Sequence, residues 1–156
     1  MMGCFIVLDE SIMTTILSNW LTSESWIVTS IHYPGSTSSG AMIKDKFAAG
    51  KGTKGSIIPD IIAEKGQYRL IVETRPKFNP LLIKKLADVV YNDAYLESLK
   101  KALRIKGEID RSKIIIGKAI HKSSKIPKKY DQPNNVVIFK IDDKGLDVIT
   151  GIELFQ

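Results

Sequence analysis

The chain has 156 residues, which is long enough for one well-buried core but short for two domains, so we expect a single domain spanning 1–156. Its 23 Lys and Arg residues outnumber 17 Asp and Glu residues, for a net charge of +6. This excess favours polyanionic partners such as nucleic acid, although solubility accounts for it equally well. Cys4 is the only cysteine, which excludes an internal disulfide and a cysteine-rich zinc site and indicates a reducing compartment, by default the cytoplasm.

Apolar residues recur on one helical face from Ile12 to Leu21, and Asp9 stands before them as an N-cap. We therefore expect a first helix that begins at Asp9 and carries Glu10 in its first turn. The apolar residues 4–8 are too few for a signal peptide or a membrane span. No other segment approaches membrane length, so we expect no membrane partner.

The next predicted element is a strand from Trp26 to Tyr33, which is rich in aromatic and β-branched residues and is ended by Pro34-Gly35. Residues 35–55 are rich in Gly, Ser and Lys, and we expect a flexible basic loop there. The loop would close over a nucleic-acid backbone or act only as a solvated linker. Its candidate phosphate contacts are Lys44, Lys46, Lys51 and Lys54.

The remaining elements alternate between strands and helices. Asn79-Pro80 begins a helix, as an N-cap followed by proline in the first turn. The other predicted elements are strands at Ser56 to Ala63, Tyr68 to Thr74, Lys113 to His121, Asn135 to Ile141 and Leu146 to Leu154, and a helical run at Tyr95 to Ile105. This order predicts an α/β fold with a mixed central β-sheet flanked by helices.

Two acidic residues occupy apolar strands that a tight turn at Lys65-Gly66 would join. That turn places Asp60 opposite Ile71 and Ile58 opposite Glu73, so the two acids share a face as diagonal neighbours about 7–8 Å apart. Carboxylates that project together need a neutralising cation, and their oxygen ligands favour Mg²⁺ or Mn²⁺. Such an ion beside a phosphate would support phosphodiester hydrolysis.

The residues Pro59-Asp60, followed by Glu73-Thr74-Arg75 at the end of an apolar strand, resemble the PD-(D/E)XK nuclease superfamily. As topology, the resemblance covers roughly Asp9 to His121. It implies a restriction-endonuclease-like core with the element order αβββαβ. It also implies a magnesium-dependent endonuclease that acts on DNA, as a homodimer or larger assembly if both strands are cut.

Residue by residue, the resemblance makes Asp60 the central metal ligand and Glu73 the second, with the Thr74 carbonyl as a third. Glu10 matches an additional acid on the first helix. Arg75 stands where the family has a lysine that orients or activates the attacking water.

Arginine keeps the positive charge of the family's lysine but does not give up its proton, so Arg75 could position water or phosphate without serving as a base. Lys77 is the alternative source of an amine. Two further hypotheses stay open. One is a catalytically inactive nuclease-like subunit that binds DNA or a partner protein, and the other is an unrelated α/β interaction module.

The densest positive region runs from Lys118 to Lys129, and its candidate phosphate contacts are Lys118, Lys122 and Lys125. A solvated run of charges explains the region equally well. His32 and His121 have no Cys or Ser partner at suggestive spacing, and we expect both at the surface.

Overall fold

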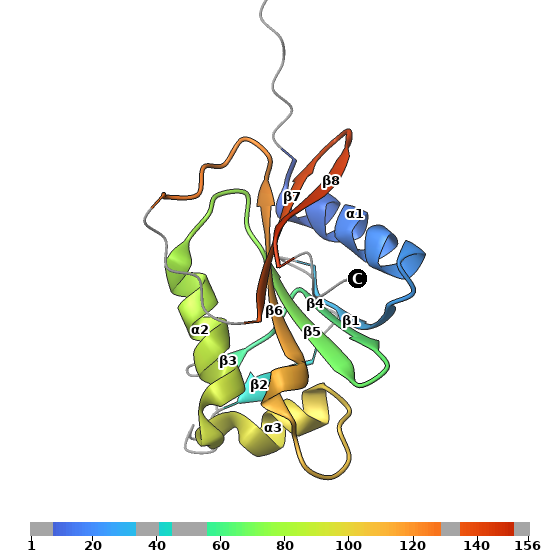
Figure 1. The fold of residues 1–156 in the computed structure, drawn as a ribbon, viewed down its shortest axis with the longest axis vertical. Coiled ribbons are helices and arrows are strands. Elements are labelled where there is room, and N and C mark those ends of the chain that lie inside the picture. Colours follow the sequence, from blue (N-terminus) through green and yellow to red (C-terminus); the bar gives the residue numbers. More distant parts are fainter. Residues whose placement is uncertain (1–7, 34–40, 45–55, 129–134, 152–156) are drawn as a thin grey trace, which may run out of the picture.

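The computed structural model describes residues 8–33, 41–44, 56–128 and 135–151. Within these ranges lie three α-helices and eight β-strands in a mixed α/β arrangement (Figure 1). Three of the predicted phosphate contacts, Lys46, Lys51 and Lys54, fall outside the described residues, as does most of the predicted basic loop.

Six strands form one mixed sheet in the spatial order β1-β4-β5-β6-β7-β8. Their bounds are β1 Ile27–Ile31, β4 Ile61–Lys65, β5 Tyr68–Thr74, β6 Ile114–His121, β7 Val136–Asp142 and β8 Gly145–Thr150. Strands β5, β6 and β7 are parallel, and the other neighbouring pairs are antiparallel. The predicted α/β class with a mixed central sheet is therefore confirmed.

The continuous strand predicted from Ser56 to Ala63 is wrong. Two short strands, β2 (Ile43–Lys44) and β3 (Ser56–Ile57), form a separate two-stranded sheet, and the chain then crosses into β4 of the main sheet. Pro59 lies at the crossing, where its missing N–H removes a ladder hydrogen bond. As a result Asp60 occupies a bend at the entrance to β4 instead of the middle of a strand.

The helices cover both faces of the sheet, with α1 (Glu10–Ser23) on one side and α2 (Pro80–Tyr91) and α3 (Leu96–Ala102) on the other (Figure 1). The predicted caps are confirmed, since Asp9 accepts a hydrogen bond from Ile12 N at 2.8 Å and Asn79 caps α2. Among the described residues, no helix combines the length and apolarity needed to cross a membrane.

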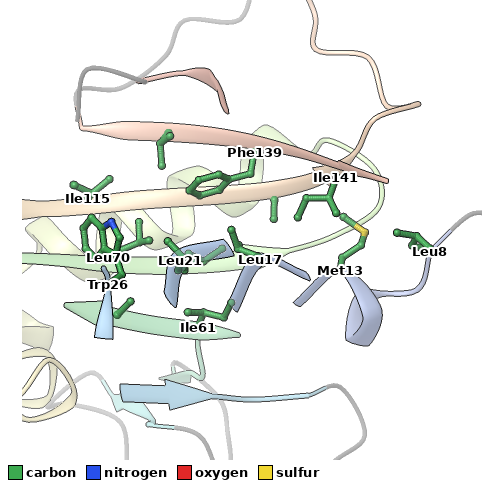
Figure 2. Packing of buried hydrophobic residues seen from close by; sticks show 14 residues of the cluster. Leu8, Met13, Leu17, Leu21, Trp26, Ile61, Leu70, Ile115, Phe139 and Ile141 are labelled. Atoms are coloured by element: carbon green, nitrogen blue, oxygen red, sulfur yellow. The ribbon is translucent and has the colours of Figure 1, made fainter. Parts of the chain in front are cut away.

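Two apolar clusters fill the space between the helices and the sheet. Leu17 and Leu21 of α1 pack with Leu70 and Phe139 of the sheet (Figure 2). On the opposite face, α2 and α3 cover a second cluster that includes Ile116. Successive residues of a strand face opposite sides, and both faces of the sheet are covered here. β6 is therefore buried along its whole length, and any polar residue on it loses contact with water.

Candidate active site

The polar residues of interest meet at the carboxyl ends of the parallel strands β5 and β6, beside the first turn of α1. Glu73 lies near the end of β5 and is directly paired in register with Lys118 of β6. Asp60 reaches the same place from the bend before β4, and Glu10 reaches it from α1. Carboxyl ends of parallel strands are the usual position of ligand sites in α/β sheets.

The β4–β5 hairpin turns one residue later than predicted. Ile61 pairs with Val72 and Lys65 with Tyr68, so the turn is centred on Gly66-Gln67, with Gly66 at a φ of 58° that glycine adopts without strain. The predicted pairing of Asp60 with Ile71 is therefore wrong. Moving the turn centre by one residue shifts the pairing by two, which preserves the face on which each side chain lies.

Asp60 is 4% exposed and anchors the end of β5. Its Oδ2 accepts a hydrogen bond from Thr74 N at 2.7 Å, while its own N–H donates to Val72 O at 3.0 Å. Burial raises the pKa of Asp60 above its ordinary value, against the opposing effects of the Thr74 N–H and of Arg75. The other carboxylate oxygen, Oδ1, accepts no hydrogen bond from a described residue.

Glu73 is 5% exposed, and its Oε2 lies 3.4 Å from Arg75 Nη1. Burial, followed by the nearby Asp60 carboxylate, raises the pKa of Glu73 to about 7, although Arg75 and Lys118 oppose the change. Two acids whose charges disfavour each other in a buried position are typical of functional sites, where a cation compensates for the cost.

Arg75 supplies that cation in this structure. Its Nη1 atom lies 3.4 Å from Glu10 Oε2, 3.4 Å from Glu73 Oε2 and 3.6 Å from Asp60 Oδ2. The same atom donates a hydrogen bond to Thr74 O at 2.7 Å. One guanidinium nitrogen is thus surrounded by oxygens of the three residues that the resemblance assigns to the metal, Asp60, Glu73 and Thr74, and by an oxygen of the additional acid Glu10.

The donor set is chemically suited to a hard divalent cation, because carboxylate and carbonyl oxygens are the ligands that Mg²⁺ prefers. Within the described ranges, however, no three His, Cys, Asp or Glu side chains are already grouped to hold a metal ion. Their oxygens stand at 3.4–3.6 Å from the guanidinium nitrogen, whereas ligands bind Mg²⁺ at roughly 2.0–2.1 Å. The residues fit such an ion only after Arg75 moves away and the acids draw together.

Lys118 lies in the core, whereas the sequence predicts it at the surface. The prediction that it is a surface contact for phosphate is wrong, because its exposure is 0% and both faces of β6 are covered. Its Nζ atom has no hydrogen-bond partner among the described residues, and burial, opposed first by Glu73, lowers its pKa to about 8. The alternation of Ile114, Ile116 and Lys118 along an apolar strand is a signal of a buried lysine, but only the parallel pairing of β5 with β6 places it beside Glu73.

The other predicted basic residues lie elsewhere. Lys77 is exposed and forms no ion pair with the acids among the described residues. Lys122 is paired 3.3 Å from Asp142 and 3.6 Å from Asp147, so its charge is already compensated. Lys125 and Lys44 are exposed, and their role as phosphate contacts stays a prediction.

The two histidines are not simple surface residues. His121 is 8% exposed, its Nδ1 lies 2.7 Å from Ser123 Oγ, and its backbone N–H donates to Pro76 O. His32 is half-buried, and its backbone N–H donates to Asp60 O at 2.8 Å. Both histidines therefore help to fix the backbone around the acids, which the sequence does not reveal.

Comparison with known proteins adds no assignment to this geometry. No family model matches the chain, and no curated protein matches it either.

Proposed function

We propose that this protein is a metal-dependent endonuclease that hydrolyses DNA phosphodiester bonds and has a restriction-endonuclease-like core. One observation carries the proposal: four oxygens, from Glu10, Asp60, Glu73 and Thr74, surround a single point of positive charge. The amine of Lys118, for which the described part of the chain offers no hydrogen-bond partner, is buried beside them, in register with Glu73. Acids, a cation position and an amine are the parts that phosphodiester hydrolysis requires.

In this proposal the carboxylates of Asp60 and Glu73 and the carbonyl of Thr74 hold Mg²⁺ or Mn²⁺. A bound divalent cation would supply charge that polarises a phosphoryl oxygen and acidifies a water molecule. Asp60 is preorganised for this role, because its hydrogen bond from Thr74 N fixes the carboxylate on the end of β5. Glu10 would complete the shell from α1.

Arg75 would have to change partners if a divalent cation were held by the acids. Its side chain is 39% exposed, and it lines an open groove of about 650 Å³ together with Pro76, Lys77 and Phe78. The guanidinium can turn into this groove without unfolding the strand. There it would bind a phosphate oxygen of the DNA through charge-assisted hydrogen bonds.

Lys118 takes the role that the resemblance gives to the lysine at position 75. Its amine is held next to Glu73 by the β5–β6 register and has no competing partner among the described residues. Such an amine can orient the attacking water by a hydrogen bond. Lys77 is not required, because it is exposed and lies past Pro76.

The second candidate is a catalytically inactive nuclease-like subunit that binds DNA or a partner protein. Arg75 favours it, because the guanidinium lies beside all three acids and offsets part of their charge without any metal ion. In that case the acids and Arg75 would form a permanent structural network, and Mg²⁺ would not bind.

Plasmid cleavage in Mg²⁺, Mn²⁺ or EDTA distinguishes the two candidates. We expect metal-dependent cutting by the wild type and its loss in Asp60→Asn, Glu73→Gln and Lys118→Met. Lys140→Met is the matched control, since Lys140 is a half-buried lysine on the neighbouring strand β7, and it should cut normally. If the wild type binds DNA and neither it nor any variant cuts, the result would instead support the inactive subunit.

Isothermal titration with Mn²⁺ tests the partner change of Arg75 directly. Arg75→Ala should bind Mn²⁺ more tightly than the wild type, because the competing guanidinium is gone, and Asp60→Asn should abolish the gain. Equal affinity in the wild type and Arg75→Ala would contradict the competition.

Cutting of both strands requires two sites, so light scattering should show a homodimer or larger assembly with DNA.

A further inference from the structure

A second polar feature lies beside β1 and is lined by other residues than the acids. It is a cavity of about 690 Å³ bounded by β1, β2 and α3, which we call the basic cavity. Three of its lining residues are the cations Lys44, Lys101 and Arg104, and hydroxyls from Thr29, Ser30 and Ser98 also line it. No Asp or Glu of the described residues belongs to the lining.

The three cations form no ion pair within the part of the chain that the structure describes. All three are exposed, and none forms an ion pair with any acid in the described part of the chain. The negative end of the α3 dipole favours Lys101 and Arg104, but it does not explain Lys44, which comes from β2. Three like charges from two elements around one hollow indicate a site for a polyanion.

Backbone hydrogen bonds to two serine hydroxyls fix the position of Lys44. Its backbone N–H donates to Ser98 Oγ of α3 at 2.8 Å. The chain just before it is tied to β1, because Ala41 N donates to Ser30 Oγ at 3.1 Å. The spacing between Lys44 and the cations of α3 is therefore built into the fold.

Arg104 occupies a backbone position that normally selects glycine. Its φ is 57°, and it closes α3 in a Schellman motif, with hydrogen bonds from Arg104 N to Lys101 O and from Ile105 N to Lys100 O. A side chain here adds strain that glycine would avoid. A guanidinium kept at a strained position and lining a basic hollow points to a ligand.

The basic cavity adjoins the candidate active site through one strand. Thr29 and Ser30 line the cavity, and two residues further on His32 donates its backbone N–H to Asp60 O. β1 therefore runs from the cavity lining toward the backbone of Asp60.

We propose that the basic cavity binds backbone phosphates of a nucleic acid and holds the strand that leads to the acids. The choice of nucleic acid among polyanions rests on the proposed function, whereas the phosphate site itself rests on the three cations. Contacts to backbone phosphates add affinity for the nucleic acid and do not depend on its base sequence.

Fluorescence anisotropy with a short labelled DNA duplex in EDTA tests the site without any cleavage. The Lys101→Ala/Arg104→Ala double variant should raise the Kd about tenfold, and its salt slope should fall by about 0.9 for each phosphate that the protein no longer neutralises. The Lys106→Ala/Lys144→Ala double variant is the control, because it removes the same charge from exposed lysines outside the cavity lining.

The control should keep the wild-type Kd within a factor of two, and thermal melting should show all three proteins folded. Equal weakening in both double variants would mean that only net charge matters and would overturn the proposal, as would an unchanged Kd in the cavity variant. Asp60→Asn should bind as the wild type does in EDTA. Absence of cleavage by the wild type, with cavity binding retained, would therefore reject the proposed enzyme and not the phosphate site.

Discussion

The candidate active site and the basic cavity each hold a basic side chain in a costly position, but the costs differ in kind. The cost of Lys118 is desolvation, since it is fully buried and no residue within the described ranges forms a hydrogen bond with its amine. Arg104 is solvated, and its cost lies in the backbone conformation at the end of α3. Both would be replaced by simpler residues if stability alone mattered.

The difference shows how electrostatics depends on burial. In the active site, Arg75 and Lys118 interact with acids at the end of a covered sheet, where solvent does little to weaken the interaction. In the cavity the three cations remain in water and repel one another weakly. Substitutions should therefore change stability strongly at the first site and weakly at the second.

The largest expected effect is the pH dependence of stability in EDTA that Glu73 causes. Its folded pKa of about 7 exceeds the ordinary 4.5, so the folded protein holds a proton that the unfolded chain releases, and stability falls as pH rises between these values. At about 1.4 kcal/mol per unit, the loss is roughly 3 kcal/mol. Urea unfolding across this range should show the fall in the wild type and a flatter profile in Glu73→Gln.

Glu108→Gln is the control for this measurement, because Glu108 is exposed, and it should keep the wild-type profile. The lowered pKa of Lys118 affects the stability in a separate pH range. From about pH 8 up to its ordinary pKa of 10.5, stability should rise with pH. A flat wild-type profile between pH 4.5 and about 7 would contradict the buried state of Glu73.

Gly117→Val should come next, because this glycine neighbours Lys118 on β6. An added Cβ would lie 2.9 Å from Val72 Cγ2 and 3.2 Å from Phe139 Cε2, so β6 must shift, at a cost of about 2 kcal/mol. Thermal unfolding measures the loss. DNA affinity in EDTA should not change, because β4 and β5 separate β6 from β1, which lines the basic cavity. A parallel loss of affinity would show that the two regions are not independent.

Lys118→Met should raise stability by about 1–2 kcal/mol at about pH 6, where the charged amine is most costly to bury. On the proposed function, the same variant should lose cleavage by about 100-fold or more. Urea unfolding and plasmid cutting measure the two effects, with Lys140→Met as the control that should leave both nearly unchanged. A destabilised Lys118→Met would indicate that the lysine is held by favourable interactions instead.

The smallest expected effect is that of Arg104→Gly, which should stabilise the protein by about 0.5–1 kcal/mol by relieving the left-handed conformation. It should also weaken DNA binding in EDTA if the guanidinium contacts phosphate. Arg104→Ala separates the two effects, because it removes the guanidinium and keeps the strain. Equal melting temperatures for the glycine and alanine variants would show that the conformation is not strained.

Local patterns predict most elements of this fold. Asp9 and Asn79 are correctly predicted as caps because capping depends on a few adjacent residues. The strand Tyr68 to Thr74 is predicted correctly because a short apolar run between turn residues is itself a local signal. The strand predicted from Ser56 is wrong, because the change from one sheet to another at Pro59 depends on packing that no local pattern records.

The sequence by itself determined the α/β class and the shared face of Asp60 and Glu73, because the alternation of side chains along strands survives a two-residue shift in pairing. Only the tertiary structure decided that Lys118 lies beside Glu73 and that Arg75 occupies the centre of the acids. The physical reason is that parallel strands joined by a long crossover have no turn to set their register. Their pairing is chosen by the packing of the whole sheet against its helices.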